Sequence, residues 1–259
     1  MKNYLPIIFL VITLFACVQE EKFPPKMSQK ISDGELQLID FDSIHSSVSQ
    51  TDEKISETIP GCLKQLTASA KNYREKDEAF SLQQLKEKWE SCKSEFSGAK
   101  LNEQYMKQWI ETTGLLLQLT AEAKYAEELQ RIFVNSANRD IKKLAASYVL
   151  TKNVDHIYVN LFVPAELNYK HSLGGDVQIR QESNYPASGK VDLHINSSRK
   201  RYIELYIRIP GWAEDAEVTV KGVKYFTPAG GYCKIAKQWR EGDVVEIIFP
   251  GIHNQAVIK

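Results

Sequence analysis

The chain has 259 residues, enough for two modest domains, and its 33 basic residues balance its 33 acidic residues. Hydrophobic residues make up 43% of it and charged residues 25%, which is ordinary for a folded protein. With no net charge and no long basic run, the chain is not expected to bind nucleic acid. It also contains no GxGxxG, Walker, HExxH, GxSxG or paired CxxC motif, which argues against the enzyme classes that depend on those motifs.

An apolar run near the N-terminus has the features of an export signal. Lys2 precedes it, residues 5–15 are almost wholly apolar, and Ala16-Cys17 follows directly. The run is short for a bilayer span, and a small residue plus cysteine at its end resembles a bacterial lipobox. The resemblance implies that Cys17 is lipidated, so we expect 1–17 to be a lipoprotein signal. A plain secretory signal or an anchor helix is the alternative.

This processing would place the protein in the cell envelope, anchored to a membrane by its lipid. The acidic start after Cys17 is similar to that of surface-exported lipoproteins, which favours the outer-membrane surface. Residues 18–55 are polar and include Pro24-Pro25, so we expect a tether with at most a short ordered piece around 36–41.

Residues 56–152 have the periodicity of amphipathic helices. Apolar residues recur at steps of three and four, as in Leu82, Leu85 and Trp89, while Lys and Glu occupy the other faces. Each amphipathic helix needs a partner to bury its apolar stripe. We therefore predict four or five helices packed on one another.

From about residue 153 the period changes to two, and the region 153–259 is predicted to be an antiparallel β-sandwich. Gly- and Pro-containing turns separate seven short alternating segments. The predicted strands are 157–163, 177–180, 191–195, 202–209, 217–220, 232–235 and 244–249. A helical half followed by an all-β half predicts an α+β fold.

Several motifs of this second half fall in an order that resembles a known family. They are "DHIYVNLFVPAEL" (155–167), "YPASGKVDLHI" (185–195), "LYIRIPGWAEDAEVTVKG" (205–222) and "GGYCKIAKQWREGDVVEIIFP" (230–250). Their order and spacing are similar to those of the β-sandwich that follows the catalytic barrel in glycoside hydrolase family 127, the β-L-arabinofuranosidases. Upstream, "LLLQLTAEAKYAEELQRIFVNS" (115–136) resembles a helix of the family's (α/α)₆ barrel. The resemblance covers about 60% of the chain, and it implies the last part of that barrel followed by the sandwich.

The resemblance also implies where catalysis would occur. In the family, cysteines and a glutamate hold zinc, one cysteine is the nucleophile, and a second glutamate is the general acid/base. The aligned metal glutamate is Glu103, but Tyr105 stands where a cysteine is expected, and the second cysteine motif is missing after Asn135. Tyrosine cannot replace a thiolate at neutral pH because its pKa is near ~10. Glu95 is the best general-acid candidate, and we expect no zinc cofactor. An exposed helical charge is the alternative for both glutamates.

Aromatic residues of the sandwich are candidates for stacking on sugar rings. Trp212 and Trp239 are the first of these, followed by Tyr225 and Phe226. The competing interpretation of Trp212 is structural: in "YIRIPGWA" (206–213) Pro210 and Gly211 end the strand, and the tryptophan folds back into the core. Arg208 would then lie on the polar face of the strand or pair with an acid such as Glu204 or Glu214.

Three cysteines remain after Cys17: Cys62, Cys92 and Cys233. An oxidising compartment permits one disulfide, for which Cys62 and Cys92 are the better pair, and three separate thiols are the equal alternative. Their spacing matches no zinc site.

Two functions therefore stay open. One is a non-catalytic, carbohydrate-associated remnant of the family; the other is a divergent but active glycoside hydrolase that acts on arabinose-containing glycans. Half a barrel would leave apolar helix faces uncovered, so a protein partner that covers them is also expected.

Overall fold

The computed structural model describes residues 28–41, 61–76, 79–96 and 101–252. The predicted signal with Cys17, and His45 and His253, lie outside these residues. The described helices are α2 (Gly61–Lys76), α3 (Ala79–Glu95), α4 (Glu103–Thr120), α5 (Ala123–Asn135) and α6 (Arg139–Ala146). The described strands are β1 (Gln29–Lys30), β2 (Leu36–Leu38), β3 (Leu150–Asn153), β4 (His156–Val159), β5 (Ala165–Lys170), β6 (Asp176–Ser183), β7 (Lys190–Ser197), β8 (Arg201–Arg208), β9 (Glu217–Val220), β10 (Val223–Tyr225), β11 (Tyr232–Trp239) and β12 (Asp243–Ile248).

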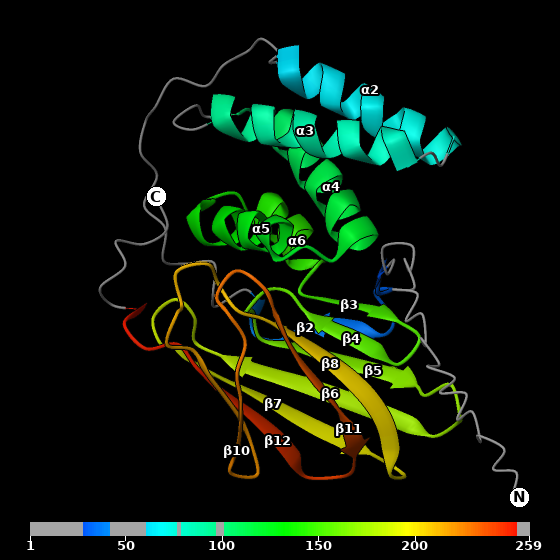
Figure 1. Cartoon of the computed structure of the whole chain (residues 1–259), viewed down its shortest axis with the longest axis vertical. Helices are drawn as coiled ribbons and strands as arrows, with labels where there is room; N and C mark the ends of the chain where they lie inside the picture. The colour runs from blue at the N-terminus through cyan, green and yellow to red at the C-terminus, as the bar shows by residue number, and fades with distance from the viewer. Residues whose placement is uncertain (1–27, 42–60, 77–78, 97–100, 253–259) are drawn as a thin grey trace, which may run out of the picture.

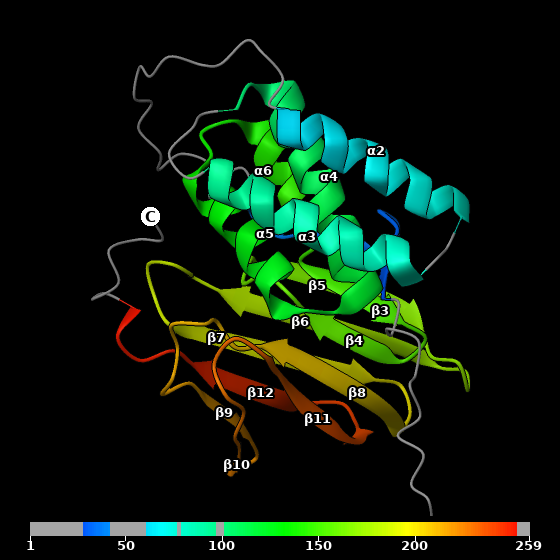
Figure 2. The ribbon, with the colours of Figure 1, turned by 45° about the horizontal axis from the view of Figure 1, so that its top comes forward.

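The strands form two sheets that face each other, with the helices gathered on one side of them (Figures 1 and 2). The five-stranded sheet has the order β1-β3-β4-β8-β11, and the seven-stranded sheet has the order β10-β9-β12-β7-β6-β5-β2. This confirms the predicted α+β organisation of helices followed by a β-sandwich. One pair departs from the antiparallel rule, because β4 runs parallel to β8.

Alternation along the strands builds the sandwich core. In β8, Ile203, Leu205 and Ile207 are fully buried, while the residues between them face the other side of the sheet. Burial of such side chains stabilises the fold by roughly 1.5–3 kcal/mol each before entropy is counted. The alternating pattern of the sequence therefore identified the correct inner face of this strand.

Two edge strands come from the segment predicted to be a polar tether. The ordered piece expected around 36–41 is present as β2, while β1 at Gln29–Lys30 was not predicted. Gln29 and Lys30 pair with Lys152 and Thr151 at the edge of the five-stranded sheet. Leu36–Leu38 pairs with β5 at the edge of the seven-stranded sheet. The segment is polar because edge strands expose one face to water, and that composition is also typical of a linker.

Aromatic side chains join helices α3, α4 and α5. The rings of Trp89 and Trp109 stack with centroids 5.2 Å apart, and the ring of Tyr125 meets Trp89 edge-on at 4.7 Å. Both indole N–H groups are satisfied, by Thr113 Oγ1 at 2.8 Å and by Glu128 Oε1 at 2.9 Å. The buried Glu128 carboxylate also accepts two hydrogen bonds from Arg131, so its charge is paired inside the core.

No helix among the described residues is long and apolar enough to cross a bilayer.

Gly114 of α4 provides a test of helix packing, because a Cβ at this position would lie 2.1 Å from the ring of Tyr148. We expect Gly114→Ala to lower the free energy of unfolding by about 2 kcal/mol, since the clash outweighs alanine's gain in helix propensity. Urea denaturation measures the change. Gly61→Ala is the matched control, because nothing lies within 4 Å of its added carbon. Equal stability of the two variants would show that the helices do not pack as described.

Candidate functional site

The two glutamates predicted for catalysis lie on helix surfaces. Glu95 is exposed at the last position of α3, and Glu103 starts α4. The Glu103 carboxylate accepts hydrogen bonds from Lys107 Nζ at 2.5 Å and Asn138 Nδ2 at 3.2 Å, and the Lys107 contact lowers its pKa. A carboxylate engaged in this way is a common helix-surface arrangement.

The chemistry of the nearby donors does not fit the family's zinc. Tyr105 occupies the position of a thiolate, and no group of three or more His, Cys, Asp or Glu side chains in the described part of the chain could hold a metal ion. A phenol with its proton in place is a poor ligand for Zn²⁺, for which cysteine and histidine are preferred. The residues present therefore do not reproduce the metal centre that the resemblance implies.

Cys62 and Cys92 lie together between α2 and α3 as free thiols that share a hydrogen bond. Burial raises the pKa of both thiols, and the charge of Glu95 adds to the increase. A thiol of raised pKa is a poor nucleophile. Cys233 is a third free thiol, buried in β11 of the sandwich.

The predicted sugar-stacking role of Trp239 was wrong. Its ring is 0% exposed, and its indole N–H donates to the carbonyl of Ile203 at 2.9 Å. Trp239 has the same strand parity as the buried Cys233 and Ile235, so strict alternation could have identified it as a core residue. Trp212 is half-buried and meets the ring of Phe249 at 6.0 Å, and Phe226 is 86% exposed.

"YIRIPGWA" forms the corner between sandwich and helices, but its arginine does not pair as predicted. Arg208 is 1% exposed, its Nε donates to the carbonyl of Asn160 at 2.5 Å, and its guanidinium lies over the ring of Phe162 at 4.8 Å. The acid whose charge acts on it is Glu127 of α5, whose carboxylate also accepts a hydrogen bond from Gly211 N at 3.3 Å. Neither Glu204 nor Glu214 takes this place.

Glu204 is instead the centre of a polar cluster on the outer face of the five-stranded sheet. Its carboxylate accepts hydrogen bonds from Tyr206 Oη at 2.6 Å, Lys234 Nζ at 2.8 Å and Tyr202 Oη at 3.2 Å. Burial opposes ionisation of the carboxyl, but Lys234 and Tyr206 outweigh it and lower the pKa of Glu204 to about 2. The ring of Tyr206 stacks on Tyr158 with centroids 4.6 Å apart.

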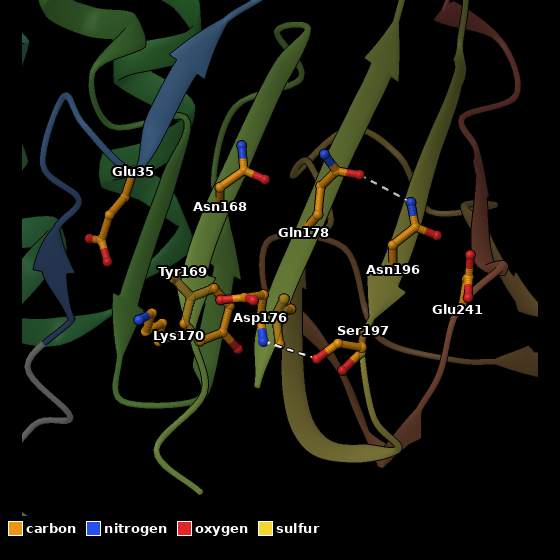
Figure 3. Close-up of a pocket in the computed structure, with 11 residues that line it drawn as sticks. Glu35, Asn168, Tyr169, Lys170, Asp176, Gln178, Asn196, Ser197 and Glu241 are labelled. Carbon is orange, nitrogen blue, oxygen red and sulfur yellow. Dashed lines mark hydrogen bonds between the residues drawn. The ribbon is translucent and has the colours of Figure 1, made fainter. Parts of the chain in front are cut away.

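A hollow with a volume of about 660 Å³ crosses the outer face of the seven-stranded sheet (Figure 3). Asn168, Gln178 and Asn196 form a row of amides along it, because they are direct cross-strand partners on β5, β6 and β7. Asn196 Nδ2 donates to Gln178 Oε1 at 3.1 Å. Glu35 and Glu241 lie at opposite ends of the row (Figure 3).

Sequence reasoning missed this amide row. Alternation shows that each of these side chains faces outward, but the sequence does not reveal the register that aligns them.

Residues 156–251, which form most of the two-sheet sandwich, match the sequence profile described as "Beta-L-arabinofuranosidase, GH127 middle domain". This part of the chain is therefore similar to the middle domain of that family. No curated protein matches the chain.

Solved structures with similar folds include a GH127 beta-L-arabinofuranosidase from Geobacillus stearothermophilus, which is 24% identical with a TM-score of 0.46 over 56% of this chain and 30% of the other. A GH127 beta-arabinofuranosidase is 22% identical with a TM-score of 0.48 over 56% and 31%. An alpha-L-rhamnosidase from Dictyoglumus thermophilum is 12% identical with a TM-score of 0.29 over 42% and 14%. The chain thus spans about a third of the length of the GH127 structures.

The Glu204 cluster predicts a pH dependence of stability. A carboxyl whose pKa falls from 4.5 to about 2 on folding contributes stability above pH 4.5 that is lost as the pH falls toward 2. We expect Glu204→Gln to remove most of this loss of stability between pH 4.5 and pH 2. At pH 7 the variant should have a free energy of unfolding lower by about 1–2 kcal/mol, a modest loss because solvent screens the exposed rim of the cluster. Urea denaturation between pH 2 and pH 7 measures both effects. If the variant lost as much stability at low pH as the wild type, Glu204 would not be the group responsible.

The contacts of Arg208 predict that lysine cannot replace this arginine without a loss of stability. Arg208→Lys should lower the free energy of unfolding by about 2–3 kcal/mol, nearly as much as Arg208→Met. The reason is that an ammonium group cannot both donate to Asn160 and lie flat on Phe162. Arg180→Met is the control, since that arginine is exposed on β6. Denaturation of the three variants checks this, and wild-type stability of Arg208→Lys would refute it.

Proposed function

We propose that the protein is a cell-envelope lipoprotein, related to β-L-arabinofuranosidases, that binds glycan without hydrolysing it. The observation that carries the proposal is the state of the family's catalytic positions. Tyr105 stands in place of a thiolate, and Glu103 forms surface contacts with Lys107 and Asn138. Retaining hydrolysis needs two groups of fixed separation facing one bond, and surface carboxylates do not supply that geometry.

The amide groove supports a binding role. Each amide both donates and accepts hydrogen bonds, as each sugar hydroxyl does. Strands lie about 4.8 Å apart, so the row of Asn168, Gln178 and Asn196 offers amides at a spacing close to the length of a sugar ring. The lining contains no exposed aromatic side chain, so the binding should be weak and governed by hydrogen bonds.

Two features support the envelope location. The apolar run and Cys17 have the pattern of a lipoprotein signal. A weak glycan-binding module gains from attachment to a surface, because many tethered copies bind a polymeric glycan together.

Hydrolysis is tested by release of p-nitrophenol from aryl arabinofuranosides and related aryl glycosides, with zinc added and with zinc chelated. We expect no turnover above background under either condition. Turnover that disappears on chelation would show that a metal site forms after all, and the protein would then be an active, divergent glycoside hydrolase.

Glycan binding is tested by calorimetric titration with arabinose-containing oligosaccharides. We expect Gln178→Leu to weaken binding about five- to tenfold and Asn168→Leu/Gln178→Leu to weaken it further, because each lost hydrogen bond costs about 1 kcal/mol. Glu246→Gln is the control, because Glu246 is an exposed residue of β12 that lies outside the groove. Absence of binding by the wild-type chain to every glycan on an array would refute the proposal.

A further inference from the structure

The β3–β4, β5–β6 and β7–β8 turns lie at one end of the sandwich (Figure 1). Hydrogen bonds from side chains and the backbone join them. Ser172, in the β5–β6 turn, donates from its backbone N–H to Asp155, in the β3–β4 turn. Arg201, at the start of β8, donates to the carbonyls of Gly174 at 2.7 Å and Leu173 at 3.2 Å. We call this end, formed by residues 153–156, 170–176 and 197–202, the sandwich tip.

The sandwich tip exposes three large apolar or aromatic side chains. Leu173 is 78% exposed, Val154 65% and Tyr202 49%, and all three line one hollow of about 270 Å³. Val154 also has φ +56°, a conformation that is costly for a β-branched residue and that Asn or Gly would adopt more easily. An exposed apolar side chain at such a position is suited to contact with a binding partner.

Basic residues surround this apolar group. The β7–β8 turn carries Arg199 and Lys200 next to each other, both exposed, and Lys170 and Arg240 are exposed at the same end. The acids in the neighbourhood are Asp155, which lines the same hollow, and the exposed Asp176 and Glu241. Cations therefore outnumber anions around the exposed Leu173 and Val154. Apolar tips within a basic ring are the pattern of surfaces that insert into the headgroup region of an anionic bilayer.

The path of the chain brings a lipid anchor to this end. Gln29 pairs with Lys152, one residue before the β3–β4 turn begins at Asn153. Cys17 is eleven residues before Ser28, so the intervening chain spans at most about 40 Å. A lipid on Cys17 would hold the sandwich tip within that distance of the membrane.

We propose that the sandwich tip docks onto the surface of an anionic lipid bilayer, through Leu173, Val154 and Tyr202 at the centre and Arg199 and Lys200 at the rim. The inference rests on the lipid anchor of the proposed function, but not on glycan binding. One acyl signal holds a protein at a membrane only marginally, and a basic apolar surface is a second signal of the kind that makes attachment stable.

The test is flotation of the chain from residue 18 onward, which lacks both the apolar run and Cys17, with vesicles of phosphatidylcholine alone and of phosphatidylcholine with about 30% phosphatidylglycerol. We expect binding to the anionic vesicles only. Arg199→Gln/Lys200→Gln should weaken it by roughly 10- to 30-fold, because each basic residue near the surface contributes about a fivefold effect. Leu173→Asp should weaken it at least as much.

The control variants are Lys64→Gln/Lys71→Gln, which removes two exposed cations from α2, and Phe226→Ser, which removes an exposed ring from the other end of the sandwich. Val154→Asn separates a loss of binding from a loss of folding. Asparagine suits the positive φ of this position, so the variant should bind more weakly while its thermal midpoint stays unchanged or rises. No flotation with anionic vesicles, or equal losses in the tip and control variants, would overturn the proposal. The vesicles contain no glycan, so that failure would leave the glycan-binding proposal standing.

Discussion

Burial of the Arg208 guanidinium is the constraint on which the joint between helices and sandwich depends. An arginine does not lose its proton in a protein, so the structure has to supply acceptors and a counter-charge for it. The Asn160 carbonyl, the Phe162 ring and the charge of Glu127 do so from separate segments. Asn160 in turn donates through Nδ2 to Tyr148 O and Thr151 Oγ1, and accepts from Tyr232 Oη at 2.6 Å. One network therefore joins α5, the turn after α6, and strands β3, β8 and β11 of the five-stranded sheet.

Sequence patterns predicted the layers of this protein well, because helix and strand periods reflect burial directly. The alternation of Ile203, Leu205 and Ile207 indicated the inner face of β8, and the spacing around Trp89 indicated a buried helix stripe. Features that depend on partners distant in sequence were not predictable in this way. The counter-charge of Arg208 comes from a helix, the amide row needs the register of three strands, and β1 and β2 have the polar composition of a linker.

The similarity to arabinofuranosidases lies in the sandwich. The matching residues 156–251 form the strands from β4 to β12 and the turns between them. Glu103, which the resemblance places at a metal position, forms contacts with Lys107 and Asn138 at the surface of α4. A shared fold does not determine the chemistry of a protein, so the function of this chain has to be argued from its own surfaces.

The two short N-terminal strands have a practical consequence for anyone who shortens the chain. They close both sheets on the same side, and Lys152 reaches across to Glu35, 117 residues earlier, at 2.7 Å. A truncation that starts at α2 would look harmless in a hydropathy plot, yet it would leave one edge of β3 and one edge of β5 unpaired. Open strand edges recruit other strands, so such a fragment would be expected to dimerise edge to edge or to aggregate, and any oligomer it formed would say nothing about the intact protein.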